Sequence, residues 1–182
     1  MTTSMRKVSH RFRRERLAWR GAVGTTAEPS FALTEANAHA LSLASESGDP
    51  WWVAVALFQL GALARAEGDR GRAEALVKES LSAFRDIGDR ADAVAPIWFC
   101  GLLAIERGAR RRGARLIAAA DPQHARRPWL QPDDRQAYEE ILAASSAAGD
   151  DELARAWEER RAMTLEQAVA YALGEQDGPS TL

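Results

Sequence analysis

The chain has 182 residues, of which 46% are hydrophobic, and it carries a formal net charge of −2 at pH 7. This length fits one domain or one short repeat array, and the nearly balanced charge gives no overall reason to expect nucleic acid or a membrane as the partner. Cys100 is the single cysteine, so no disulfide forms within the chain. No stretch of 18 uncharged apolar residues occurs, and we expect a cytoplasmic protein without a membrane-spanning helix.

The first 20 residues are strongly basic. They hold seven lysine or arginine residues and one acidic residue, Glu15, which leaves the rest of the chain with a net charge of −8. A basic segment attached to an acidic body is typical of an interaction arm, although a solvated terminus has the same composition. We expect residues 1–28 to form a basic and weakly ordered arm.

A glycine-aspartate pair recurs every 20 residues. The pairs and the glycine that continues the series are Gly48-Asp49, Gly68-Asp69, Gly88-Asp89 and Gly108. A glycine just after a helix adopts the left-handed conformation that closes the last turn. An aspartate after it begins the next helix, because its carboxylate accepts hydrogen bonds from free backbone N–H groups. The spacing therefore predicts helices joined by tight turns.

The segments between these turns alternate in character. Residues 51–66 are apolar on almost all sides, which is typical of a helix buried between neighbours. Residues 70–87 place apolar side chains on one face and charged side chains on the other, as an amphipathic outer helix does. Pro96 would interrupt a helix that began directly after the third turn, so we predict a turn at 90–94 and a helix at 95–107.

The pattern also repeats at single positions, forty residues apart. The matching pairs are Leu57 and Ile97, Leu60 and Cys100, Gly61 and Gly101, Ala64 and Ala104, Ala73 and Gly113, Val77 and Ile117, and Ser80 and Ala120. Small residues among them allow paired helices to approach closely. A buried helix paired with an amphipathic one is the repeating unit of an α-solenoid. We predict an all-α fold over residues 29–173, made of antiparallel helix hairpins that resemble tetratricopeptide (TPR) repeats with a period of about 40.

The chain beyond these repeats departs from the period. Several prolines predict a loop of about a dozen residues after position 120, and helices follow at 133–147 and 151–162. Thr164 and Gln167 have the spacing of a capping box that begins a last helix, which ends near Leu173. We expect these last helices to cap the C-terminal end of the repeats, and residues 174–182 to form a disordered tail.

Two segments resemble one known family. Residues 113–120 (GARLIAAA) and 156–169 (AWEERRAMTLEQAV) are similar to the C-terminal TPR-like region of large LuxR-type and AfsR/SARP-type bacterial regulators, and the resemblance covers roughly residues 31–173. In that family the helical region follows an ATPase module and often accompanies a DNA-binding domain. The chain has no G-x-x-x-x-G-K-[ST] phosphate loop and no segment long enough for a helix-turn-helix domain. The resemblance therefore implies the part that senses a ligand or holds partner proteins, and implies no ATP hydrolysis.

No catalytic pattern stands out in the sequence. The histidines His10, His39 and His124 are far apart, and neither a G-x-S-x-G nor a G-x-G-x-x-G segment occurs. Carboxylates that are adjacent in sequence do not share a helix face. We expect a protein that is not an enzyme and that needs no cofactor and no metal.

The concave face of the repeats is the first candidate binding surface. By analogy with TPR registers, it would be lined by Val55, Phe58, Arg65, Trp98, Leu102 and Glu106. Aromatic and arginine side chains are the usual anchors of an interface, so this surface suits a protein or peptide partner. The alternative is that Phe58 and Trp98 are core residues covered by flanking helices.

An arginine cluster is the second candidate surface. It consists of Arg107, Arg110, Arg111, Arg112 and Arg115. Arginine suits phosphates and carboxylates, although a solvated helix face paired with acidic residues has the same composition. A nucleic-acid-associated regulator that uses this cluster and the basic arm is therefore an alternative function.

The sequence suggests two further hypotheses, one about a binding pocket and one about self-association. A small-molecule pocket or an unrecognised enzyme site between the repeats is an alternative, with tryptophans as its lining: Trp51, Trp52, Trp98, Trp129 and Trp157. A short solenoid also leaves its end faces uncovered, so we expect self-association through residues 31–60.

Overall fold

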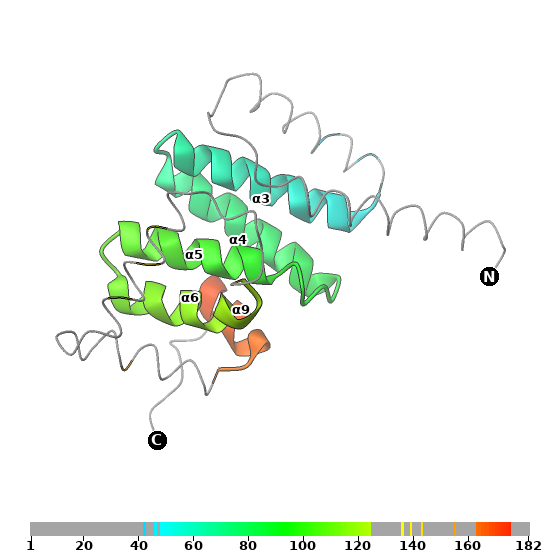
Figure 1. Ribbon diagram of the computed structural model, residues 1–182. Helices are drawn as coiled ribbons and strands as arrows, with labels where there is room; N and C mark the ends of the chain where they lie inside the picture. Colours follow the sequence, from blue (N-terminus) through cyan, green and yellow to red (C-terminus); the bar gives the residue numbers. More distant parts are fainter. Residues whose placement is uncertain are drawn as a thin grey trace.

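The computed structural model describes residues 48–124 and 163–175, together with the single positions Ser42, Glu46, Gln136, Glu139, Ala143 and Arg155. All regular secondary structure in this described part is helical, which confirms the all-α prediction for these residues. The helices are α3 (Pro50–Ala66), α4 (Arg70–Asp86), α5 (Val94–Glu106), α6 (Arg110–His124) and α9 (Leu165–Leu173) (Figure 1).

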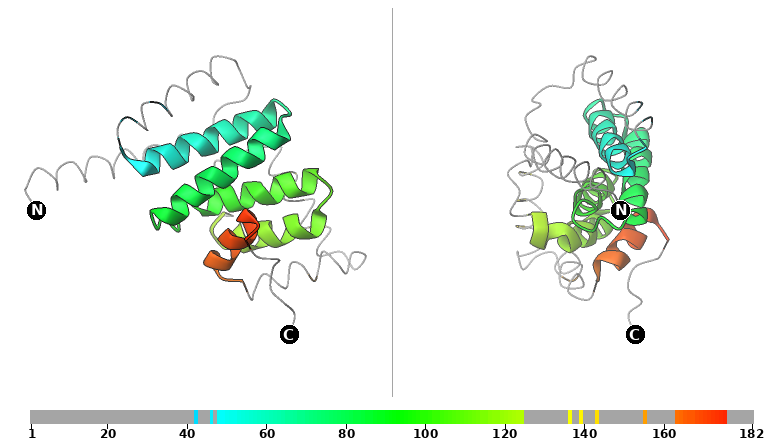
Figure 2. Two further views of the ribbon diagram at one scale, coloured as in Figure 1. Left: turned by 180° about the vertical axis from the view of Figure 1, so that it is seen from behind. Right: turned by 90° about the vertical axis from the view of Figure 1, so that its right-hand side faces the viewer.

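Four of these helices form two antiparallel hairpins. In the first hairpin α3 packs along α4, and in the second α5 packs along α6. The hairpins lie side by side, with α4 against α5 (Figure 1). The short helix α9 packs against α4, α5 and α6 on the side that the left view of Figure 2 shows. The C-terminal helix therefore contacts both hairpins and not the last one alone.

The turns form as the glycine-aspartate spacing predicts. Gly48, Gly68, Gly88 and Gly108 have positive φ angles of 69°, 83°, 71° and 84°. The carboxylate of Asp49 accepts a hydrogen bond of 3.0 Å from the backbone N–H of Trp51, and that of Asp69 accepts one of 3.0 Å from Arg72. Side-chain caps thus begin both helices of the first hairpin.

The second hairpin begins with a separate turn. The carboxylate of Asp89 accepts from the backbone N–H of Asp92 at 3.1 Å, and regular helix starts only at Val94. Pro96 is the third residue of α5, where a backbone N–H would have no partner within the helix. The predicted turn and helix are therefore confirmed to within one residue at each end.

Glycines set the distance between the paired helices. A Cβ atom built on Gly61 of α3 would lie 2.6 Å from Val77 Cγ2, and one on Gly101 of α5 would lie 2.6 Å from Ile117 Cγ1 and 3.0 Å from the carbonyl oxygen of Gly113. Real side chains essentially never approach this closely. The repeat seen forty residues apart in the sequence is thus a repeated close contact between the helices of each hairpin.

The core follows the two predicted helix types. The amphipathic helix α4 buries the residues Ala73, Val77, Ser80, Leu81 and Phe84. Helix α5 is buried from Val94 to Ala104 without interruption. The one buried hydroxyl of α4, that of Ser80, donates a 2.6 Å hydrogen bond to the carbonyl oxygen of Ala54 in α3. The hydrogen bond satisfies a polar group that would otherwise destabilise the core.

The loop predicted after residue 120 does not begin at that position. Helix α6 continues through Pro122 and ends at His124. Proline removes one backbone donor but fixes a helical φ angle, and the loss of one hydrogen bond in the last turn of a helix is tolerated. The predicted arm at 1–28 lies outside the described residues, as does most of the helices predicted at 31–47, 133–147 and 151–162. The single positions described within these three helices are helical.

We expect Gly101→Ala to destabilise the protein. The new methyl group would overlap Ile117 and the backbone of α6, and such overpacking costs up to about 3 kcal/mol, against a gain of about 0.5 to 1 kcal/mol in helix propensity. Gly71→Ala in α4 is the matched control, because its Cβ would lie 3.7 Å from the nearest atom, in ordinary contact. This control should stabilise the protein by about 0.5 to 1 kcal/mol. Urea unfolding followed by circular dichroism measures both, and equal effects of the two substitutions would contradict the close-contact model.

Candidate binding surfaces

The six residues predicted to line the concave face divide into two groups. Val55, Trp98 and Leu102 lie in the core, with exposed fractions of 6%, 3% and 2%. Phe58 is half-buried, and the side chains of Arg65 and Glu106 are 23% and 24% exposed. Only the second group offers side-chain surface to a partner.

The partly exposed residues lie in one row across the hairpins, together with the buried ring of Phe99, which is 5% exposed. The rings of Phe58 in α3 and Phe99 in α5 meet edge to face, with their centroids 5.5 Å apart. The guanidinium of Arg65 lies 5.3 Å from the centroid of the Phe99 ring and donates to Glu106 Oε1 at 2.6 Å. Arg70 donates to the other carboxylate oxygen, Oε2, at 3.2 Å. We call these five residues the aromatic–arginine row.

Phe99 is a member of this row that the sequence reasoning missed. The forty-residue period matches Phe58 with Trp98, whereas the ring that Phe58 contacts belongs to the next residue along α5. A sequence period predicts equivalent positions in two repeats. It does not predict which side chains meet between them, because that depends on how the hairpins cross.

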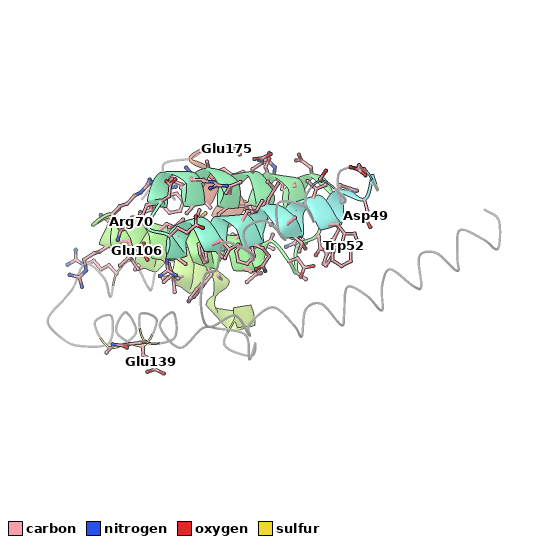
Figure 3. The ribbon with its side chains drawn as sticks, turned by 90° about the horizontal axis from the view of Figure 1, so that it is seen from above. Asp49, Trp52, Arg70, Glu106, Glu139 and Glu175 are labelled. Carbon is pink, nitrogen blue, oxygen red and sulfur yellow. The ribbon has the colours of Figure 1, made fainter. Side chains whose placement is uncertain are left out.

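The two ends of the first hairpin differ in their polar contacts. At one end, the buried indole N–H of Trp51 donates to a carboxylate oxygen of Asp92 at 2.8 Å. At the other end lie Arg70 and Glu106, far from Asp49 and Trp52 in the same view (Figure 3). Both sets of contacts join the first hairpin to the second, so they hold the junction at both ends.

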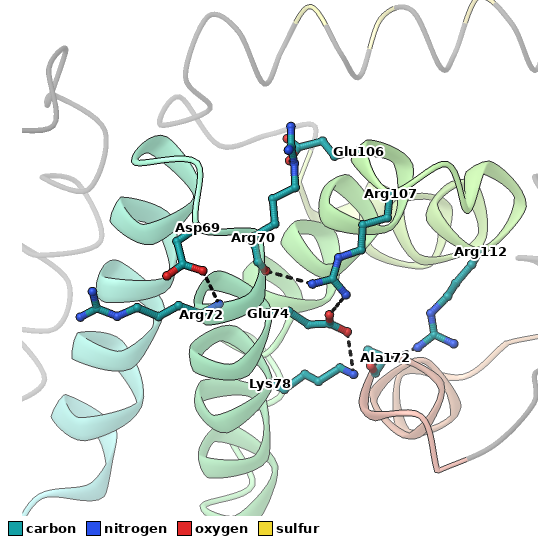
Figure 4. A network of polar contacts seen from close by, with 9 residues as sticks. All are labelled: Asp69, Arg70, Arg72, Glu74, Lys78, Glu106, Arg107, Arg112 and Ala172. Atoms are coloured by element: carbon teal, nitrogen blue, oxygen red, sulfur yellow. Dashed lines mark hydrogen bonds and ion pairs between the residues drawn. The ribbon is translucent and has the colours of Figure 1, made fainter.

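The predicted arginine cluster is divided among several structural contacts. Arg107 forms an ion pair with Glu74 and donates to the carbonyl oxygen of Arg70 at 3.1 Å, and Glu74 also pairs with Lys78 at 2.8 Å (Figure 4). Arg112 points instead toward α9. The remaining members differ in exposure, since Arg110 and Arg111 are exposed and Arg115 is half-buried. Two of the five arginines, Arg107 and Arg112, therefore take part in different contacts within the fold.

Helix α9 is held by polar contacts near its two ends. Thr164 and Gln167 form the predicted capping box, in which the Thr164 hydroxyl accepts from the Gln167 N–H at 3.2 Å and the Gln167 side chain accepts from the Thr164 N–H at 2.8 Å. Glu166 in the first turn pairs with Arg90 at 2.5 Å. A hydrogen bond from its own backbone N–H and the charge of Arg90 lower the pKa of Glu166. The sequence prediction of this helix start is confirmed.

The C-terminal end of α9 is bound by two arginines. Arg112 donates to the carbonyl oxygens of Tyr171 and Ala172 at 2.6 and 3.2 Å, and its guanidinium lies 4.6 Å from the centroid of the Tyr171 ring. Glu175 pairs with Arg85 of α4 at 2.8 Å, and the hydrogen bond with Glu175 raises the pKa of Arg85. Glu175 belongs to the segment predicted as a disordered tail, and it is the last residue that the structure describes. The partners of these arginines lie about 60 to 90 positions away in sequence, and no local signal identifies them.

The single cysteine is a core residue of α5. Cys100 is buried, and desolvation raises the pKa of its thiol to about 11 from an ordinary value near 9. The charges of Lys78 and Arg112 act in the opposite direction but do not outweigh burial. Among the residues that the structure describes, no three His, Cys, Asp or Glu side chains gather as they would around a metal ion.

Comparison with known proteins gives no relative. No protein-family model, curated protein or solved structure matches this chain. Within the described part of the chain, none of the helices is long and apolar enough to cross a membrane.

The raised pKa of the Cys100 thiol predicts a pH dependence of stability. The folded state holds the thiol proton more tightly than the unfolded chain, so this contribution is complete below about pH 9 and is lost as the pH rises to about 11. We expect the unfolding free energy to fall by up to about 1.4 kcal/mol per pH unit in this window.

Comparison with Cys100→Ala isolates this contribution from other groups that titrate at high pH. Urea unfolding of both proteins at pH 8 and pH 10 gives the two differences in unfolding free energy. The wild type should lose more stability than the variant. An identical loss in both proteins would show that the thiol makes no contribution.

Proposed function

We propose that the chain is a TPR-like, non-catalytic helical-repeat scaffold that binds a protein or peptide partner. The observation that carries this proposal is the repeated hairpin contact, at Gly61 with Val77 and again at Gly101 with Ile117. Stacked helix hairpins of this kind form solenoids, which present extended surfaces to other proteins. The proposal thus rests on an architecture whose usual role is binding.

The aromatic–arginine row is the surface that we assign to the partner. It crosses from α3 to α5 and combines aromatic rings with arginines, the residue types that most often anchor interfaces. Glu106 already neutralises much of the charge of Arg65 and Arg70. The surface therefore favours a partner that supplies an apolar side chain against Phe58 together with hydrogen-bonding groups for the row.

A regulatory role follows from the family resemblance. Residues 113–120 and 156–169 resemble the TPR-like region of LuxR-type and AfsR/SARP-type regulators. We propose that the chain is the sensor or interaction part of such a bacterial system for transcriptional regulation, and that it acts in the cytoplasm.

We do not extend the proposal to nucleic acid as the direct ligand. Arg107 pairs with Glu74, and Arg112 donates to carbonyl oxygens at the end of α9, so both guanidinium groups already have partners within the fold. Phosphate recognition depends on several cationic groups that share one surface. The observed contacts therefore favour a protein partner over the alternative that uses the arginine cluster.

Substitution of Phe58 tests this function. We expect Phe58→Ala to lower capture of a partner from source-cell lysate at least about ten-fold, because hot-spot truncations cost 2 kcal/mol or more. Leu76→Ala is the matched control, since Leu76 is also a half-buried apolar residue of the same hairpin but lies outside the row. Trp98 is unsuitable for substitution, because it is 3% exposed and its removal would leave a cavity.

The comparison requires that all three proteins fold, which circular dichroism checks. The captured protein is identified by mass spectrometry, purified and titrated against each variant. A partner bound by wild type and Leu76→Ala but lost by Phe58→Ala supports the proposal. Equal binding to all three proteins would exclude the aromatic–arginine row as its site.

Self-association through residues 31–60 is a second, separate prediction. The first hairpin is an end of the described repeats, and uncovered repeat ends tend to associate. We expect the mass measured by light scattering to rise with protein concentration. A monomer mass that stays constant up to high concentration would contradict this prediction.

A further inference from the structure

The surface beneath α9 belongs to both hairpins. It is formed by α4, α5 and α6, with Arg85, Arg90 and Arg112 around it, and we call it the α9-docking surface. It buries the side chains Ala168, Val169, Tyr171 and Ala172 on one face of α9. An amphipathic helix therefore rests on a surface that neither hairpin provides alone.

The polar contacts at this surface recognise features that many helices share. Arg112 binds backbone carbonyl oxygens in the last turn of α9, and every helix ends with carbonyls that lack a partner within the helix. Arg90 pairs with Glu166 in the first turn, where the helix dipole favours an acidic residue. Only the apolar face, with one aromatic and three smaller side chains, depends on the identity of the residues.

Apart from its buried apolar face, little holds α9 in place. Helix α9 has nine residues, and isolated helices of fewer than about 12 residues are marginal in water. Its ion pairs are exposed, with side-chain exposures of 69% and 61% for Arg90 and Glu166 and 41% and 50% for Arg85 and Glu175. Exposed pairs contribute little to stability. Another helix with the same features can therefore reproduce these polar contacts, in competition with α9, which is tethered to the surface and has a high effective concentration there.

We propose that the α9-docking surface binds, in trans, a short amphipathic helix of another protein, and that α9 is its intramolecular occupant. The partner helix carries an acidic residue in its first turn, a second acidic residue after its end, and an apolar face with one aromatic ring among small side chains. These features complement Arg90, Arg85 and the ring contact with Arg112. The surface uses none of the residues of the aromatic–arginine row, so this proposal does not depend on the function proposed above.

A labelled peptide of residues 163–175 tests the proposal with the full-length chain. Fluorescence anisotropy measures its binding to wild type and to Val169→Asp, whose own α9 has a charge on its buried face. We expect the variant to bind the peptide at least about ten-fold more tightly, because the tethered α9 of the wild type competes at a high effective concentration. A peptide that carries the same aspartate is the control and should bind to neither protein.

A second substitution tests which surface the peptide binds. Adding Arg112→Ala to the Val169→Asp chain should weaken peptide binding by roughly ten-fold, since a charge-assisted hydrogen bond and a cation–π contact are lost. If the folded Val169→Asp chain binds the peptide no better than wild type, or if Arg112→Ala has no effect, the proposal is wrong.

A milder variant decides the question if Val169→Asp fails to fold. The double substitution Glu166→Gln and Glu175→Gln changes only exposed side chains and weakens the docking of the chain's own α9, while the peptide keeps both glutamates. We expect its affinity for the peptide to exceed that of wild type by roughly two- to ten-fold. An unchanged affinity in this folded variant would overturn the proposal.

Discussion

The architecture depends on the close approach of two helices at a glycine within each hairpin. Gly61 and Gly101 stand where any side chain would overlap a β-branched residue of the paired helix, Val77 or Ile117. The contact places the backbones of the paired helices against each other, and the inner helix must then be apolar on nearly all sides. Helices α3 and α5 have this character, and the charged residues accordingly gather on α4 and α6 and at the helix ends.

The packing of one hairpin on the other relies on polar contacts of a different kind. The indole of Trp51 and the carboxylate of Asp92 meet in the buried region at one end, and Glu106 bridges Arg65 and Arg70 at the other. Apolar side chains pack in many similar ways, whereas a hydrogen bond between buried groups requires one geometry. The buried contact between Trp51 and Asp92 therefore restricts the angle at which the hairpins cross, whereas the contacts of Glu106 at the other end are exposed and restrict it less.

Features that depend on neighbouring residues were predictable from the sequence. The glycine turns, the aspartate caps and the Thr164–Gln167 capping box involve groups at most five residues apart, and each is present as expected. The start of the second hairpin was also predictable, because proline limits where a helix begins. The extent of α6 was not, because a proline near a helix end is compatible with either outcome.

The sequence patterns did not predict contacts between residues that are far apart in the sequence. The interpretation of Arg112 as part of an anion-binding cluster followed from composition, but its partners are backbone carbonyls of a helix about sixty residues away. Likewise, the forty-residue period suggested Trp98 as the aromatic counterpart of Phe58, and the ring in contact is that of Phe99. The sequence period predicts which positions are equivalent in the two hairpins. It does not predict the contacts between the hairpins, and both candidate surfaces lie where the hairpins meet.

The two proposed surfaces share this junction. Helix α9 contacts α4 of the first hairpin and both helices of the second, so a helix that replaces it also binds across the boundary. The aromatic–arginine row crosses the same boundary through Phe58, Phe99 and Glu106. Coupling between two sites is reciprocal, so a helix whose binding changed the affinity of the row for its partner would itself be bound more tightly or more weakly by the same factor when the row is occupied. Within these two proposals, such coupling would pass through the boundary between the hairpins, because α9 itself contributes no residue to the row.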